Sequence, residues 1–169
     1  VISTYSNCCG AHGNGYYSKV LDINAQGLDP EFEVHKWFPR FFPDDVFPWD
    51  INDNNVIVGN AGSLFGTARN PIKILPTEDG GWNGFDYVEM DTLLSGAGSE
   101  GGLLSATHNA VSISEGDRPF ATGVSTLDDL THAVVWDVNT GTIVADFGLR
   151  TTAHGISANG QYVIGSKIN

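Results

Sequence analysis

The stretch that decides the fold runs from His132 to Gly165 and reads HAVVWDVNTGTIVADFG followed by LRTTAHGISANGQYVIG. Apolar and polar residues alternate over Ala133–Asp137 and again over Thr142–Asp146, and the glycine-containing turn Val138–Gly141 separates the two runs. A second turn signal, Asn159-Gly160, precedes another apolar run. Short alternating runs divided by glycine turns are typical of an antiparallel meander. We therefore predict consecutive antiparallel strands over this part of the chain.

Parts of this stretch recur earlier in the chain, and the recurring unit is short. It consists of an isoleucine, an Asn or Ser, a few polar or small residues, an apolar run and a glycine. Its copies, from the clearest to the weakest, are Gly155–Gly165, Asp50–Gly59, Ser112–Gly123 and Asp22–Gly27. In such a unit the Asn or glycine turn reverses the chain and the apolar run forms the partner strand. We expect neighbouring units to stack, because one small sheet cannot bury its own faces.

The spacing of the anchoring isoleucines favours a propeller-like arrangement. Ile113 and Ile156 are separated by about 40 residues, the length of one four-stranded propeller blade. Ile51 and Ile113 are separated by about 60 residues, which fits one blade plus an insertion, and the glycine-rich stretch 77–102 is the predicted insertion. The predicted fold class is therefore all-β, with antiparallel meander repeats arranged as a β-propeller or as part of one. Residues 1–169 then form a single β-repeat domain or a fragment of a longer repeat protein.

The same residues resemble the HAF-type extracellular repeats of bacteria, a propeller-like family. That family's unit runs His-Ala-Phe, an aromatic residue, a turn, Leu-Gly, and then Ala-x-x-Ile-Asn-x-x-Gly-x-Val-Val-Gly. Here His132–Trp136, Phe147-Gly148 and Ala153–Gly165 follow that order, with Val134 in place of the family's Phe and Ser157 in place of its Asn. The resemblance implies a propeller-like fold and export from the cell. It implies no reaction.

Charge and hydropathy exclude several classes of partner. The 169 residues include 20 acidic and 8 basic side chains, for a formal net charge of −12 at pH 7. Nucleic-acid backbones are bound by clustered Lys and Arg, whereas the basic residues here are scattered, so we expect no nucleic-acid partner. No apolar run approaches the ~20 residues of a membrane-spanning helix, so we expect no membrane span. The acidic composition, together with the resemblance, predicts an extracellular or periplasmic location.

The sequence contains none of the motifs that place a nucleophile beside its base. Gly-x-Ser-x-Gly and His-Glu-x-x-His are absent, and the histidines share no motif. We therefore favour a non-catalytic extracellular binding or scaffold module whose partner is an unknown protein or a glycan. The alternative is a secreted hydrolase with acidic residues at a propeller mouth, for which the candidate carboxylate pairs are Asp44 with Asp45 and Asp128 with Asp129.

The segment Trp37–Trp49 is rich in aromatic residues and prolines and is predicted to form a rigid loop. Aromatic rings on such a loop can stack on sugars or on a partner protein. The candidate ligand-binding residues are four rings and three polar anchors: Trp37, Phe41, Phe42, Trp49, Arg40, Asp44 and Asp45. The same segment also fits a plug that buries its rings over a sheet end, and the rarity of large exposed apolar patches favours the plug.

Cofactor sites are weakly indicated. The loops Asp50–Asn54 and Asp22–Gly27 resemble calcium loops, but each offers few acids in ligand register. The Cys8-Cys9 pair and His12 lack the second pair of ligands that zinc sites use. The match of Gly96–Gly101 to a dinucleotide-binding loop lacks the flanking strand and helix. We expect no cofactor, and a structural calcium ion is the one alternative left open.

Overall fold

The computed structural model describes residues 2–4, 17–21, 31–33, 45–62, 69–77, 87–93 and 108–169, with side chains from Val46 onward. Every regular element in these residues is a β-strand, and every strand pair is antiparallel. The predicted all-β class with antiparallel meanders is therefore confirmed. A closed ring of sheets is not seen within this part of the chain.

Four sheets follow one another along the described chain. The first is three-stranded and contains β1 (Ile2–Thr4), β2 (Tyr17–Leu21) and β3 (Glu31–Glu33). The second is four-stranded and contains β4 (Asp45–Ile51), β5 (Ile57–Gly62), β6 (Arg69–Ile74) and β7 (Tyr87–Glu89). The third is four-stranded and contains β8 (Asn109–Ile113), β9 (Phe120–Leu127), β10 (Leu130–Asp137) and β11 (Thr142–Leu149). The fourth is two-stranded and contains β12 (Thr151–Ile156) and β13 (Val163–Lys167).

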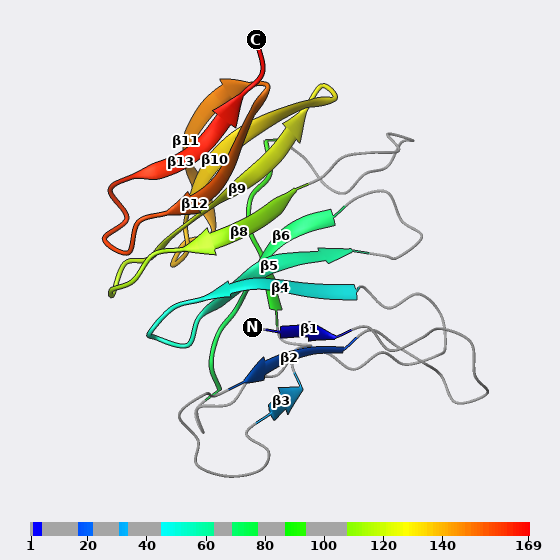
Figure 1. Ribbon diagram of the computed structural model, residues 1–169, viewed down its shortest axis with the longest axis vertical. Helices are drawn as coiled ribbons and strands as arrows, with labels where there is room; N and C mark the ends of the chain where they lie inside the picture. Colours follow the sequence, from blue (N-terminus) through cyan, green and yellow to red (C-terminus); the bar gives the residue numbers. More distant parts are fainter. Residues whose placement is uncertain are drawn as a thin grey trace, which may run out of the picture.

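The sheets stack in chain order, from β1–β3 at the bottom of Figure 1 to β12 and β13 at the top. β2 contacts β4, β8 contacts all three of β4, β5 and β6, and β12 contacts β8, β9 and β10. Within each sheet the strands neighbour one another in the order in which they occur along the chain. Each sheet is therefore a local meander, and the contacts between successive sheets form the larger fold.

Apolar side chains fill the space between the second and third sheets. Buried residues of both sheets form one cluster, which consists of Val56, Val58, Met90, Ala110, Ile113, Ala121, Val134, Trp136 and Val138. A second cluster on the opposite face of the second sheet consists of Val46, Ile57, Ala61, Ile72 and Ile74. The neighbours Ile57 and Val58 belong to different clusters, because side chains alternate between the faces of a strand. The second sheet is thus buried on both faces at these positions.

Each described copy of the repeat forms the hairpin between the first two strands of its sheet. The residue after the isoleucine holds the turn, because its side-chain oxygen accepts the N–H at the start of the next strand. Asn52 accepts from Val56 at 3.0 Å, Ser114 accepts from Phe120 at 2.9 Å and Ser157 accepts from Tyr162 at 3.0 Å. Asn and Ser exchange at this position because both supply that oxygen.

The glycine that ends each copy faces a bulge in the first strand. The register shifts between Pro48 and Asp50, between Ala110 and Ser112, and between Ala153 and Gly155. The glycines opposite these bulges are Gly59, Gly123 and Gly165. A Cβ on any of them would overlap the carbonyl oxygen of Phe47, Asn109 or Thr152, respectively. The glycine shared by these copies is therefore a steric requirement of the bulged hairpin.

Two details differ from the sequence prediction. Residues 45–49, expected in a rigid loop, lie in β4. β4 is an edge strand, where the missing N–H of Pro48 breaks no ladder of hydrogen bonds. β11 and β12, expected in one meander, lie in different sheets, and Arg150 between them has a φ of 58°. The chain therefore leaves one sheet and enters the next within a single residue.

The predicted insertion 77–102 is described in part. It contains β7, which pairs with β6 and completes the second sheet. Residues 78–86 and 94–107 lie outside the described residues, and so does the weakest repeat copy, Asp22–Gly27.

Candidate functional site

Trp49 is the predicted binding residue whose side chain the structure describes. It lies at the bulge of β4, and 52% of its surface is exposed. Its Nε1 donates a hydrogen bond to Oδ1 of Asn60 at 2.7 Å, and Asn60 is fully buried. The polar end of the indole is therefore fixed to the sheet while about half of the side chain faces solvent. A fixed, half-exposed indole has the geometry of a stacking platform.

Three further side chains surround this indole and form with it the Trp49 patch, which consists of Phe47, Trp49, Asn60 and Arg69. Phe47 pairs with Asn60 across β4 and β5. The guanidinium carbon of Arg69 lies 4.9 Å from the centroid of the Phe47 ring, within the range of a cation–π contact. The Nδ2 atom of Asn60 is buried and lacks an acceptor within the described structure. The patch thus combines aromatic surface, a cation and one unpaired amide donor.

The other predicted ligand-binding residues cannot be joined to this patch. Trp37, Arg40, Phe41, Phe42 and Asp44 lie outside the described residues, and Asp45 is described by its backbone alone, as the first residue of β4. Asn60 and Arg69 escape the sequence analysis because they lie on other strands. Only the register of β4, β5 and β6 brings them beside Phe47 and Trp49.

The carboxylate pairs considered for a hydrolase do not form a described acid–base site. Asp128 and Asp129 are the two central residues of the β9–β10 turn, with φ of 50° and 61°, and both are exposed. Positive φ at both positions is the signature of a type I′ hairpin turn. Of the other pair, Asp44 lies outside the described residues. The role of Asp128 and Asp129 is therefore to reverse the chain.

The calcium-like loop after Asp50 uses its oxygens within the protein. Oδ2 of Asp50 accepts from the hydroxyl of Ser112 at 3.0 Å and from the N–H of Ile113 at 2.9 Å. Oδ1 of Asn52 accepts from the N–H groups of Asn54 and Val56 at 3.1 and 3.0 Å. These atoms hold a turn and join two sheets, which explains their pattern in the sequence without an ion.

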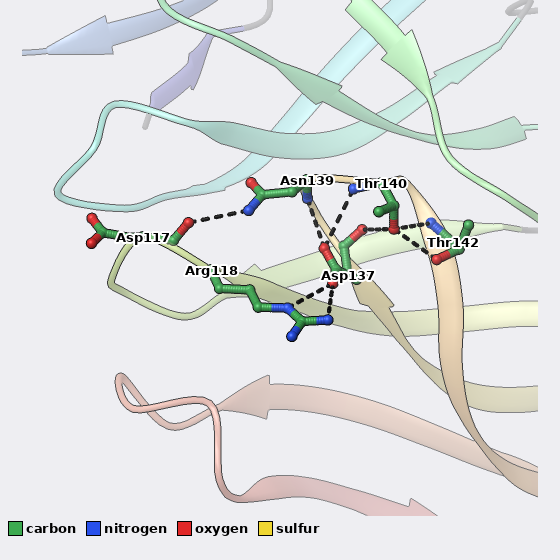
Figure 2. Close-up of polar contacts among 6 residues, drawn as sticks. All are labelled: Asp117, Arg118, Asp137, Asn139, Thr140 and Thr142. Carbon is green, nitrogen blue, oxygen red and sulfur yellow. Dashed lines mark hydrogen bonds and ion pairs between the residues drawn. The ribbon is translucent and has the colours of Figure 1, made fainter.

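A buried carboxylate organises the turn between β10 and β11 (Figure 2). Nε and Nη2 of Arg118 donate to Oδ2 of Asp137 at 3.0 and 2.9 Å, and the N–H groups of Asn139 and Thr140 donate to its Oδ1 at 3.0 and 3.3 Å. Burial opposes ionisation of Asp137, but the Arg118 hydrogen bonds and the two backbone N–H groups outweigh it and lower the pKa of the carboxyl. A carboxylate with this many partners stabilises the turn and is a poor proton acceptor.

Histidines and a serine form a polar row across the third sheet. The Ser125 hydroxyl lies 2.8 Å from Nδ1 of His108, and Ser125 pairs with His132 across β9 and β10. Nδ1 of His132 lies 2.9 Å from Oδ1 of Asp146, while its Nε2 is buried without a hydrogen-bond partner in the described structure. Sequence analysis treated these residues separately, because only the strand register aligns residues that lie so far apart along the chain.

The serine in this row is packed as a structural group. Ser125 is 0% exposed and His108 is 2% exposed. The Ser125 hydroxyl oxygen also accepts the N–H of Leu93 at 3.0 Å, and Nδ1 of His108 accepts the N–H of Thr126 at 3.2 Å. Burial lowers the pKa of His108, so the ring is held neutral. A substrate could reach this hydroxyl only if the second and third sheets separated.

No family model, curated protein or solved structure matches this chain. Among the described residues, no helix is long and apolar enough to cross a membrane.

Proposed function

We propose that this chain is a non-catalytic extracellular binding or scaffold module built from propeller-type stacked sheets, similar to the HAF-type repeats. One observation carries the scaffold role. The residue before the repeat isoleucine accepts the backbone N–H of the isoleucine in the next sheet. Asp50 accepts from Ile113 at 2.9 Å, and Ser112 accepts from Ile156 at 3.4 Å. The repeat residues are thus used to stack sheets, as a structural repeat requires.

The binding role rests on the Trp49 patch, and a glycan is the ligand class that suits it best. A half-exposed indole can stack on a sugar ring, and hydroxyl groups can pair with Nδ2 of Asn60 or with Arg69. Aromatic surface beside a few polar groups is the usual composition of a small-ligand site. A protein partner is the second ligand class. The extracellular location is supported by the acidic composition and by the resemblance.

A glycan array followed by titration with the best oligosaccharide tests the binding role, with intrinsic tryptophan fluorescence as the readout. We expect Trp49→Ala to weaken binding at least tenfold. Val88→Ala is the matched control, because Val88 is similarly exposed, at 46%, and lies on β7. An array without any binder would contradict the glycan ligand, and equal affinities of the Trp49→Ala variant and the wild type would contradict the site.

A secreted hydrolase is the second candidate function, and one observation favours it. The Ser125 hydroxyl lies beside His108 in the same row as the His132–Asp146 pair, and a serine with a histidine base is a common hydrolytic arrangement. Incubation with a fluorophosphonate probe distinguishes the two functions. Labelling of Ser125 that is lost in Ser125→Ala would favour the hydrolase, whereas an unlabelled protein favours the module.

A further inference from the structure

The fourth sheet exposes a surface whose counterpart in the second sheet is buried. Counted back from the repeat glycine, Ile164 on β13 occupies the position of Val58 on β5. Val58 is 0% exposed, because it packs against the third sheet, whereas Ile164 is 68% exposed. Tyr162, two residues earlier, corresponds to Val56 and is 69% exposed. The sheet β12–β13 therefore carries the apolar pattern of a sheet that has a further neighbour.

The outer edge of β13 lacks a strand partner in the described structure, unlike its counterparts. Ile57 on β5 pairs with Ile74 on β6, and Ala121 on β9 pairs with Trp136 on β10. Val163 holds the same repeat position on β13, and the only strand that pairs with it among the described residues is β12. A free strand edge offers unpaired N–H and C=O groups to an incoming strand.

The direction of these free groups follows from the hydrogen bonds of β13 and its ends. The carbonyl of Tyr162 accepts from Ser157, and the N–H of Ile168 donates to Arg150. Because backbone groups in an antiparallel pair alternate between the two sides of a strand, Val163, Gly165 and Lys167 present theirs to the free edge. Three residues with outward backbone groups are enough to pair with a strand of ordinary length.

A pocket lies beside this edge, between the third and fourth sheets. Its volume is about 230 Å³, and it is lined by Ala133, Phe147 and Thr151 of the third and fourth sheets and by Val163, Gly165 and Lys167 of β13. Phe147 is 52% exposed there. In the preceding interface, the corresponding space is filled by the third strand, β10, whose Val134 and Trp136 are both 0% exposed. The pocket is therefore the place where the side chains of a third strand would pack.

We propose that the free edge of β13 and this pocket bind an extended strand with apolar side chains at alternate positions, the pattern of β6 and β10. The strand would pair with the outward groups of Val163, Gly165 and Lys167, and its large apolar side chains would enter the pocket against Phe147. Strand addition of this kind derives its affinity from backbone hydrogen bonds and its specificity from alternate side chains. The docking site is independent of the Trp49 patch, which lies on the second sheet.

A fluorescein-labelled peptide with the sequence of Leu130–Asp137 tests the proposal, because β10 is the third strand of the preceding sheet. Fluorescence anisotropy should show saturable binding to the intact chain. Lys167→Pro removes one outward N–H, and Phe147→Asp places a charge in the pocket, so each should weaken binding at least tenfold. Val88→Asp is the matched control, since Val88 is exposed to a similar extent on β7, and it should bind like the wild type.

Further arms separate the outcomes. A peptide carrying V134S and W136S should not bind, since it keeps the backbone and loses the apolar pattern. Absence of binding to the wild-type chain, with its far-ultraviolet circular dichroism intact, would overturn the proposal. Sedimentation equilibrium without peptide should show a monomer. Self-association that Lys167→Pro abolishes would also overturn it, because the occupant would then be a second copy. Unchanged peptide binding by Trp49→Ala would separate this site from the proposed glycan site.

Discussion

The backbone N–H of Ile113 donates a hydrogen bond to Oδ2 of Asp50 at 2.9 Å, and this bond crosses from the third sheet to the second. The Ser112 hydroxyl donates to the same oxygen at 3.0 Å, and its own oxygen lies 3.4 Å from the backbone nitrogen of Ile156 in the fourth sheet. Equivalent residues of three successive repeats are thus joined in a row. The row links the local turn motif to the stacking of the sheets.

Asp50→Ala should destabilise the protein by about 1–3 kcal/mol, because it removes the acceptor of a backbone N–H at a sheet boundary. Asp50→Ser should recover part of this loss, since Ser112 fulfils the same role in the next sheet. Urea unfolding followed by tryptophan fluorescence measures both. Asp53→Ala, three residues along and exposed, should stay within about 0.5 kcal/mol of the wild type. Equal effects of Asp50→Ala and Asp53→Ala would contradict the role given to this row.

Gly123→Ala should cost more than Gly116→Ala. A Cβ at Gly123 overlaps the Asn109 carbonyl oxygen on the paired strand, so β8 must move or the pairing must break. Gly116 has a φ of 92°, but a Cβ added there would meet no atom within 4 Å, so its substitution carries only backbone strain of about 1–3 kcal/mol. Thermal unfolding should show the larger decrease in Tm for Gly123→Ala. The reverse order would show that the bulge does not require this glycine.

The stability of the chain should fall in acid through Asp137. Its pKa is lowered in the folded state, so the carboxylate contributes stability above its unfolded pKa of about 4. That contribution is lost as pH falls through the lower folded value. Asp137→Asn should reduce stability at pH 7 and flatten its dependence on pH in this range. Urea midpoints measured between pH 7 and pH 2 test this, and parallel profiles for the two proteins would contradict it.

His108 should produce a second loss of stability at higher pH. Its pKa is lowered by burial, so as pH falls below about 6.5 the unfolded chain takes up a proton that the folded chain refuses. Stability from this group is complete above the unfolded pKa and decreases below it. His108→Asn, which keeps an acceptor near Ser125, should give a smaller change in the urea midpoint between pH 7.5 and pH 5.5. The exposed His154 provides the control, as His154→Asn should leave that change as in the wild type.

Local chemistry was sufficient to predict the hairpins. The turn Val138–Gly141 lies between β10 and β11 as predicted, and Ala158–Gly160 lies in the turn between β12 and β13. These turns depend on residues within a few positions of one another, such as Ser157 and Tyr162. The predicted loop up to Trp49 was wrong from residue 45 onward, because a rule about proline in strands depends on whether the strand lies at a sheet edge.

By itself, the sequence determined the strand class, the turns and the repeated unit, because alternation, glycine and Asn or Ser act over short distances. Only the tertiary structure decided which repeat residues meet and which side chains are covered. Val58 and Ile164 are equivalent in the repeat, but one is fully buried and the other largely exposed. Burial depends on the sheet that packs against a residue, and hydrogen bonds such as Trp49 to Asn60 depend on strand register. Both join residues far apart in the chain, so no short stretch of sequence contains them.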